Sequence, residues 1–311
     1  RFDSALWRVP TDSNDMTWQR ELWDRLEAST PGGYFVRGEA ASEPTALAGL
    51  ALAAAGRREA ALAAGEWLLS QQTEAGTVGV TATRPTPCWP TALAILLWRR
   101  LDDPQTYGSA IDRAVAWTLA ERGRTHERRP HAGHDTTLVG WSWAAETHSW
   151  LEPTAMFVLA LKAVGQSQHP RTREAVRLMI DRLLPEGGCN YGNTIVLGQE
   201  LLPHVEPTGL VLTALADESI ADPRLEWSLE YLERELTGDT PTASLAYGLL
   251  GLAAHKRTPP EQAIWLEAAY RRTVQQGASP FKLALIALAN SDSHPLGAVS
   301  SISQRRRDAE K

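Results

Sequence analysis

Three glutamates stand directly before a Pro-Thr dipeptide: Glu43, Glu152 and Glu206. A carboxyl group at the apolar mouth of a cavity keeps its proton, because burial disfavours the charged form, and it can then act as a general acid. A carboxylate in the first turn of a helix has another use, since it stabilises that helix through the helix dipole. The recurrence of the same residue fits both interpretations, so the sequence leaves both open.

Titratable and aromatic side chains gather in two segments, 124–151 and 187–205, which also contain five of the eight histidines. Their candidate site residues are His126, His131, His134, Asp135, Trp141, Trp143, His148, Trp150, Tyr191 and His204. Long segments rich in particular side chains are usually functional in a compact domain. We therefore expect the site in these two segments, with Glu152 and Glu206 at their ends.

Tryptophan is unusually frequent, with 12 residues against 4 phenylalanines. Trp89, Trp141, Trp143 and Trp150 precede apolar segments, where their electron-rich faces would stabilise a carbocation or hold an apolar ligand. Packing within the protein core would explain these four tryptophans equally well. A second group is expected to pack within outer helices: Trp67, Trp117, Trp227 and Trp265.

His131, His134 and Asp135 could together ligate a metal ion, and a solvated loop beside the basic run 122–129 is the alternative. The spacing has no helical frame that would fix these side chains, so we predict no metal and no cofactor. Arg84, Arg124, Arg128 and Arg129 would permit diphosphate recognition but are also typical of a solvated loop.

A repeated sequence motif predicts the helices that position these residues. A proline, mostly followed by threonine, opens an apolar run of about 10 to 13 residues six times, at Pro44, Pro90, Pro153, Pro207, Pro241 and Pro280. Proline is favoured in the first turn of a helix, where its missing amide costs nothing. A helix that is apolar on nearly all faces must be buried all round. These runs are therefore predicted as inner helices.

An amphipathic segment precedes each inner helix, and one apolar stripe beside a charged one predicts an outer helix. The six outer helices are expected at about 16–28, 58–72, 107–122, 171–184, 223–236 and 260–276. Six alternating pairs predict an all-α fold, an α/α six-hairpin toroid, as a single domain over residues 1–290 with a C-terminal tail at 291–311. A short strand at 77–82 is the only β expectation. The loops that enter the inner helices would line one mouth of the barrel.

Composition excludes several classes of function. The 311 residues carry a net charge of −6, so no overall positive field favours nucleic acid. Two cysteines, Cys88 and Cys189, favour a reducing, cytoplasmic location. The apolar runs are too short to cross a membrane, and the first ten residues do not resemble a signal peptide.

The repeats resemble the prenyltransferase and squalene-cyclase repeat family, over about residues 16–290. The matching pieces are the helix starts above, the segment from Gln71 to Gly76 and the segment from Pro185 to Gly192. In the class II terpenoid cyclases of that family, an acidic residue two positions before Thr-Ala protonates an alkene or epoxide. The resemblance places Glu152 in that role, before Thr154-Ala155. The protein prenyltransferase branch uses an Asp, Cys and His zinc site, for which this chain lacks the Asp-x-Cys pairing.

These observations predict a terpenoid-cyclase-like enzyme that binds an isoprenoid-like apolar small molecule and performs a proton-initiated cyclisation or isomerisation. Glu152 would be the acid, with His148 as its orienting partner, and Glu206 and Asp135 are the alternative candidates for the acid. The mouth would be lined by aromatic and imidazole side chains, namely Trp89, Trp141, Trp143, Trp150, Tyr191 and His204. The alternative is a non-catalytic toroid that binds a lipid or peptide or scaffolds a partner enzyme. Peripheral contact with a membrane stays open.

Overall fold

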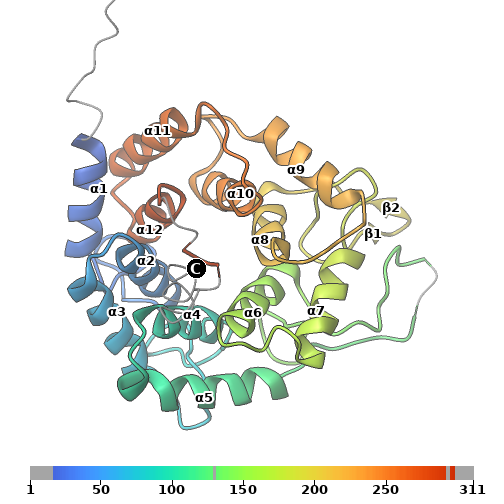
Figure 1. Ribbon diagram of the computed structural model, residues 1–311, viewed down its shortest axis with the longest axis horizontal. Helices are drawn as coiled ribbons and strands as arrows, with labels where there is room; N and C mark the ends of the chain where they lie inside the picture. The colour runs from blue at the N-terminus through green and yellow to red at the C-terminus, as the bar shows by residue number, and fades with distance from the viewer. Residues whose placement is uncertain (1–16, 129–130, 292–294, 298–311) are drawn as a thin grey trace, which may run out of the picture.

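The computed structural model describes residues 17–128, 131–291 and 295–297. Within these residues, twelve α-helices alternate between two concentric rings (Figure 1). The outer helices are α1 (Thr17–Ala28), α3 (Arg58–Ser70), α5 (Pro104–Ala120), α7 (Pro170–Asp181), α9 (Arg224–Glu235) and α11 (Gln262–Gln275). The inner helices are α2 (Ser42–Ala54), α4 (Thr91–Leu101), α6 (Leu151–Ala163), α8 (Val205–Leu215), α10 (Thr242–Ala254) and α12 (Pro280–Ala289). The predicted all-α toroid of six hairpins is confirmed.

Burial follows the two patterns that separate the rings in the sequence. In α6 every residue from Leu151 to Lys162 is buried, whereas α7 buries six residues along one stripe. An Ala- and Leu-rich helix can pack on all sides, because its side chains leave no polar group to solvate. The inner ring therefore forms the core, and the outer ring covers it.

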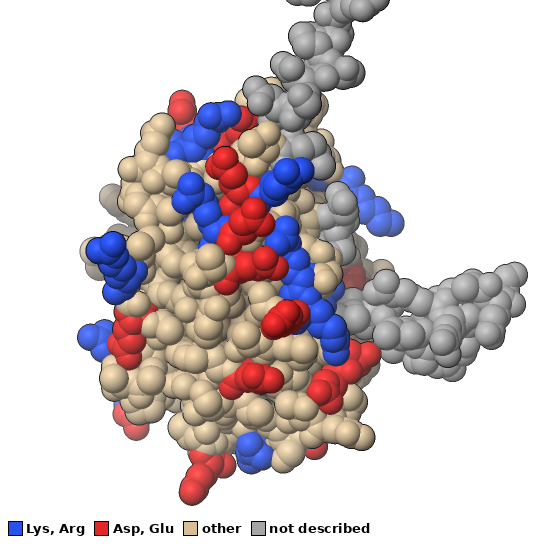
Figure 2. Space-filling view, turned by 90° about the vertical axis from the view of Figure 1, so that its left-hand side faces the viewer, with Lys and Arg blue, Asp and Glu red and all other residues tan. Residues whose placement is uncertain are grey.

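The outward faces of the outer helices carry charges of both signs. Figure 2 views the side on which α1 and α3 lie, where basic and acidic side chains are interspersed around uncharged areas. Arg57, just before α3, pairs with Glu27 of α1 at 2.7 Å, and Arg271 pairs with Glu267 within α11. These pairs lie on the charged stripe that the sequence assigns to outer helices.

Three inner helices begin earlier than their prolines suggest. The helices α2, α6 and α8 start two residues before the proline, so that the glutamate of the repeated motif lies in the first helical turn. Proline is accommodated there because the amides of the first turn have no partner within the helix. The three glutamates thus share one position relative to their helices.

The expected strand at 77–82 is wrong. That segment forms only isolated bridges, among them Gln72 with Val78 and Ala41 with Thr81. A short antiparallel hairpin occurs elsewhere, between β1 (Ile195–Val196) and β2 (Gln199–Glu200). The loop at 77–82 lacks a neighbouring segment long enough to build a ladder, which a local sequence pattern cannot reveal.

Trp227 also differs from its prediction, because its side chain is 42% exposed instead of packed on the inner ring. The inward stripe of α9 consists of Ser228, Leu229, Tyr231 and Leu232. Trp227 lies outside that stripe, while its backbone is approached closely by Gly187. Trp67, Trp117 and Trp265 do pack against the core as expected.

Each of four repeats fixes its entry loop with the threonine that follows the proline. The hydroxyl oxygens of Thr45, Thr91, Thr154 and Thr208 accept the backbone N–H of Gly32, Val78, Trp141 and Cys189 respectively. Each hydroxyl also lies within hydrogen-bond distance of the carbonyl of the same loop residue, at 3.2 or 3.3 Å. We call this arrangement the threonine clip. It satisfies buried backbone groups of the loop at a fixed point of the barrel.

The inner helices α8 and α10 touch through glycine. A Cβ atom added to Gly209 would lie 2.2 Å from the carbonyl oxygen of Tyr247, and one added to Gly251 would lie 2.7 Å from the carbonyl oxygen of Gly209. Backbones of two helices approach this closely only where one of them lacks a side chain. The position of Tyr247 therefore depends on Gly209.

Gly209→Ala is expected to destabilise the fold by about 1–3 kcal/mol, because the new methyl group meets backbone that cannot yield like a flexible side chain. The matched control is Gly108→Ala in outer helix α5, where a Cβ would meet nothing within 4 Å. That change should stabilise the fold by about 0.5–1 kcal/mol through helix propensity. Urea unfolding measures both, and equal effects of the two substitutions would contradict the close approach of α8 and α10.

Part of the expected tail packs on the barrel. Leu296 is 1% exposed, and the carbonyl of Pro295 accepts a hydrogen bond from Arg100 at 2.7 Å. Most of 291–311, like Met16 and the first residues, lies outside the described residues, so the boundary at residue 290 stays a prediction. Among the described helices, none is both long and apolar enough to cross a membrane.

Candidate active site

The three glutamates of the repeated motif lie in the first turns of α2, α6 and α8, at the same end of the inner ring. Glu43 and Glu152 are buried, with 9% and 8% exposed, and Glu206 is partly buried. Burial of a carboxylate is costly unless it is paired or takes up a proton. None of the three forms an ion pair among the described residues.

Each glutamate has a raised pKa. Burial, together with the charges of Glu206 and Glu43, raises the pKa of Glu152 to about 8, and the Trp143 side chain acts in the opposite direction. Burial and Glu206 raise the pKa of Glu43 to about 7. Burial also raises the pKa of Glu206, which Ser244 lowers by a hydrogen bond. The charge of Glu206 raises the pKa of both Glu43 and Glu152, so the three carboxyl groups share one electrostatic environment.

Two tyrosines complete this group. The hydroxyl of Tyr34 donates to Glu43 at 2.6 Å. The hydroxyl of Tyr247 is buried without a hydrogen-bond partner, and its pKa is raised well above the usual value by burial and by the charges of Glu43, Glu206 and Glu152. A buried donor without a partner is rare, and beside several acceptors it indicates a place for a ligand. We call Glu43, Glu152, Glu206, Tyr34 and Tyr247 the glutamate cluster.

An aromatic pocket of about 460 Å³ lies between the segment before α4, the C-terminal end of α5, the loop 141–145 and Phe157 of α6, and no residue of the glutamate cluster is part of its lining. Its aromatic lining is Trp89, Trp117, Trp141, Trp143 and Phe157. Trp89 and Trp143 meet edge to face, with ring centroids 4.8 Å apart. Trp143 connects the pocket with the cluster, since it lines the pocket and is near enough to Glu152 to lower the pKa of that carboxyl group. The volume lies within the range of small-molecule sites, about 300–1,000 Å³.

Trp141 is principally a structural residue. It is completely buried, its indole N–H donates to the carbonyl of Thr118 at 3.0 Å, and the guanidinium of Arg171 lies over its ring at 4.3 Å. An indole held on both faces and at its nitrogen keeps one orientation. It thereby supports the wall to which Trp143 belongs.

Four of the candidate site residues form two aromatic pairs at the mouth of the barrel. The rings of Tyr191 and His204 lie tilted against each other with centroids 4.9 Å apart, and burial and the charges of Glu152 and Glu206 raise the pKa of Tyr191. The rings of Trp150 and His148 lie tilted against each other with centroids 4.7 Å apart. Tyr191 is therefore brought to the glutamate cluster, whereas His148 faces another pocket.

His148 and Asp135 are not placed to act with Glu152. His148 lines a separate pocket with His126 and Arg182, and its pKa is lowered by burial and by the charges of these two residues. The carboxylate of Asp135 accepts hydrogen bonds from Thr137, which lower its pKa. An acid that is ionised at neutral pH is a poor proton donor.

The metal alternative has no geometric support in the described part of the chain, where no three His, Cys, Asp or Glu side chains are grouped closely enough to hold an ion. His134 bonds Thr194 through its Nδ1 at 3.0 Å. Arg129, one of the arginines near the mouth, lies outside the described residues.

Sequence reasoning underrated Glu43 and missed both tyrosines of the cluster. Glu43 carries the same signal as Glu152, namely the phrase Glu-Pro-Thr-Ala. Tyr247 had a weaker signal, as a tyrosine within the apolar run that forms inner helix α10. Tyr34 follows a Gly-Gly pair in a short loop and offered none.

Comparison with known proteins concerns the fold. No protein-family model matches the sequence, and no curated protein matches it significantly. Ligand-free type II terpene cyclase MstE from Scytonema is similar in structure, with TM-score 0.59 and 13% identity, covering 91% of this chain and 99% of that one. A variant of MstE in complex with its substrate, geranylgeranyl dihydroxybenzoate, has TM-score 0.57 and 13% identity, with the same coverage.

A glycosidase variant in complex with glucose is equally similar, with TM-score 0.58 and 12% identity, covering 92% of this chain and 99% of that one. The chain therefore shares the α/α toroid of enzymes that act on chemically different substrates. At these identities the likeness establishes the fold, and function must be argued from the site.

Proposed function

We propose that this chain is an enzyme that transfers a proton from Glu152 to an isoprenoid-like apolar substrate and so initiates a cyclisation or isomerisation. The observation that carries the proposal is the position of Trp143, which lines the aromatic pocket and is near enough to the Glu152 carboxyl group to lower its pKa. A substrate in that pocket would lie near a carboxyl group that holds its proton at neutral pH.

The surroundings of Glu152 suit a reaction that creates positive charge. Glu43 and Glu206 raise the pKa of Glu152 because their field favours positive charge, and the same field stabilises a carbocation formed nearby. The faces of Trp89 and Trp143 stabilise a cation within the pocket.

The pocket is lined mainly by aromatic and small apolar side chains, with Thr86, Glu121 and Ser142 as its polar exceptions. An isoprenoid chain fits such walls, since it makes no hydrogen bonds along its length. The similarity in fold to MstE, whose substrate complex contains a geranylgeranyl group, supports this class of substrate.

Glycoside hydrolysis is the second candidate, favoured by the presence of more than one carboxyl group with a raised pKa in the same cluster. Glycosidases pair a protonated carboxyl group with an ionised one. The glucose complex of a glycosidase with this fold supports the same idea. The sparse polar lining of the pocket ranks this candidate second, because sugars require many hydrogen-bond partners.

The test is a product assay with both substrate classes. The protein is incubated with farnesyl, geranylgeranyl and squalene-type substrates, and separately with glucosides, and the products are identified by mass spectrometry. A cyclised or isomerised isoprenoid supports the proposal, and released glucose supports the second candidate. A chain that binds isoprenoids and converts neither class would be the non-catalytic toroid.

The turnover number is expected to fall as the pH rises above about 8, because the donor must carry its proton and the pKa of Glu152 is raised to about 8. Below that value the donor stays protonated, so the profile should be flat on the acidic side until other groups titrate. A pH–rate profile under substrate saturation measures this. A basic limb centred near the ordinary glutamate pKa of about 4.3 would contradict the assignment.

The cellular location is also a proposal. Cys88 and Cys189 are free thiols, and free thiols persist in a reducing compartment. This supports the cytoplasm as the site of action.

A further inference from the structure

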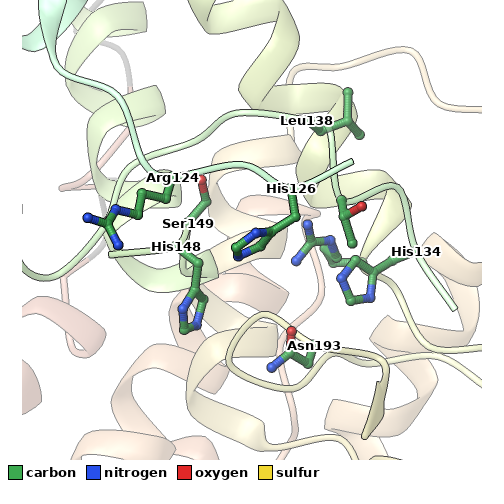
Figure 3. Close-up of a pocket in the computed structure, with 9 residues that line it drawn as sticks. Arg124, His126, His134, Leu138, His148, Ser149 and Asn193 are labelled. Atoms are coloured by element: carbon green, nitrogen blue, oxygen red, sulfur yellow. The ribbon is translucent and has the colours of Figure 1, made fainter. Parts of the chain in front are cut away.

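A second pocket, of about 170 Å³, collects the polar residues of the long loops that the proposed function does not use. Figure 3 shows its side chains, which come from segments 124–149 and 182–193; His126, His134, His148 and Asn193 lie around one space, and Arg124 extends from its side. Six of the lining residues carry nitrogen atoms in their side chains: Arg124, His126, His134, His148, Arg182 and Asn193. All six offer N–H groups, so the pocket presents hydrogen-bond donors.

Arg182 is the fixed element of this pocket. Its side chain is 6% exposed, and its guanidinium donates to the carbonyls of Gly192 and Asp135. Asp181 lies 3.5 Å from its Nε atom. These partners hold the charge in one place on the wall, which pre-organises it for a ligand.

The lining of the pocket contains two arginines and, among the described residues, no carboxylate. Both arginines have an acidic neighbour just outside the lining, since Asp181 lies 3.5 Å from Arg182 and Glu146 lies 3.5 Å from Arg124 on the exposed rim. Asp181 also accepts the Asp135 N–H at 2.8 Å. The positive charge of the lining is therefore partly offset behind the arginines, while the space in front of them faces donors.

The imidazoles respond to these charges. Burial and the charge of Arg182 lower the pKa of His134 to about 4, although Asp181 and Asp135 act in the opposite direction. At His148 the acting charges, those of Arg182 and His126, both lower the pKa. Cationic and neutral donors around a small space are the arrangement that binds an oxyanion.

We propose that this pocket binds a phosphoryl-type oxyanion, held by Arg182 and Arg124 and by the imidazoles of His126, His134 and His148. The volume of about 170 Å³ suits a phosphate or diphosphate group. The anion could be free in solution or form the head of a phosphorylated substrate. The pocket is argued from its own residues and does not depend on proton donation by Glu152.

Isothermal titration of the full chain with inorganic phosphate and with diphosphate tests the proposal. Binding of either anion should weaken roughly tenfold in the double variant Arg124→Gln/His126→Gln, which loses two donors. Both side chains are exposed, so the fold should be unaffected. The matched control is Arg122→Gln, which removes one positive charge from the same loop outside the pocket and should change the affinity less than twofold.

The outcomes separate the sources of the anion. Tighter binding of geranylgeranyl diphosphate than of diphosphate, lost in the double variant, identifies the head of a substrate, whereas equal affinities identify a free anion. The proposal is overturned if neither anion binds, or if the double variant binds as the native chain does. Anion binding that persists without any isoprenoid conversion would overturn the proposed function and leave this site in place.

Discussion

Replacing Glu152 by glutamine is expected to lower the turnover number by about 10²- to 10⁴-fold, the usual contribution of a general acid. The amide fills the same space, but it has no proton to give. The Michaelis constant should change little, because the aromatic pocket that would hold the substrate is intact. Steady-state kinetics with whichever substrate is converted measures both constants.

The matched control is Glu186→Gln, an exposed glutamate in the following entry loop, which should leave turnover unchanged. Turnover by Glu152→Gln equal to that of the native chain would remove Glu152 from the mechanism. Loss of activity in the control as well would indicate a general effect of the substitutions and not a proton donor.

Stability separates a catalytic effect from a folding defect. The pKa of Glu152 is raised to about 8 in the folded state, against about 4.3 for an unperturbed glutamate, so the folded chain binds more protons than the unfolded one between these values. The contribution of Glu152 to stability is therefore fully present below about pH 4.3, and it is lost as the pH rises to about 8. The Glu152→Gln variant lacks this loss, so at pH 8 it should be at least as stable as the native chain.

Replacing Arg171 by methionine is expected to destabilise the fold by about 3 kcal/mol. The guanidinium donates to the carbonyls of Val139, Gly140 and Glu121 at 3.0, 3.2 and 3.1 Å, and it lies over the Trp141 ring. Arg171 therefore connects outer helix α7 to the start of the loop that carries Trp143 and to residues 139–140 within that loop. Methionine keeps the apolar stem but leaves these acceptors without their donor.

Urea unfolding measures the loss of stability, and limited proteolysis within 121–150 should become faster in the Arg171→Met variant. The control is Arg177→Met on the same helix, where the side chain is exposed and the cost should stay within about 0.5 kcal/mol. Equal stability of the two variants would show that Arg171 does not hold the loop.

The fold could be predicted because its signals are local. A proline before an apolar run, as at Pro153, and an amphipathic segment before it are both legible within about 20 residues, and together they specify rings of inner and outer helices. The exact helix starts could not be read, because the Glu-Pro pair is compatible with a helix that begins on either side of it. Trp227 was misplaced because its position relative to the inward stripe depends on the packing of α9.

The candidate site was predicted only in part. Glu152, Trp143 and Tyr191 could be selected from the sequence because they flank the starts of inner helices, and the structure places Trp143 and Tyr191 within the electrostatic reach of Glu152. The encounter of Glu43 with Glu152 and Glu206 arises from closure of the ring, which joins α12 to α2 and is invisible in one dimension. The expected association of His148 with Glu152 assumed a helix across both residues, whereas α6 begins only at Leu151.

The threonine clip has a consequence for how such a barrel diversifies. In three repeats the clip joins residues 13 positions apart, but in the fourth it joins Cys189 to Thr208, 19 positions apart, and the β1–β2 hairpin lies in between. The two residues that the clip joins keep their contact while the chain between them lengthens, so an entry loop can change in length and sequence between fixed ends. A substitution or insertion in one entry loop can therefore change the side chains at the mouth without changing the twelve described helices.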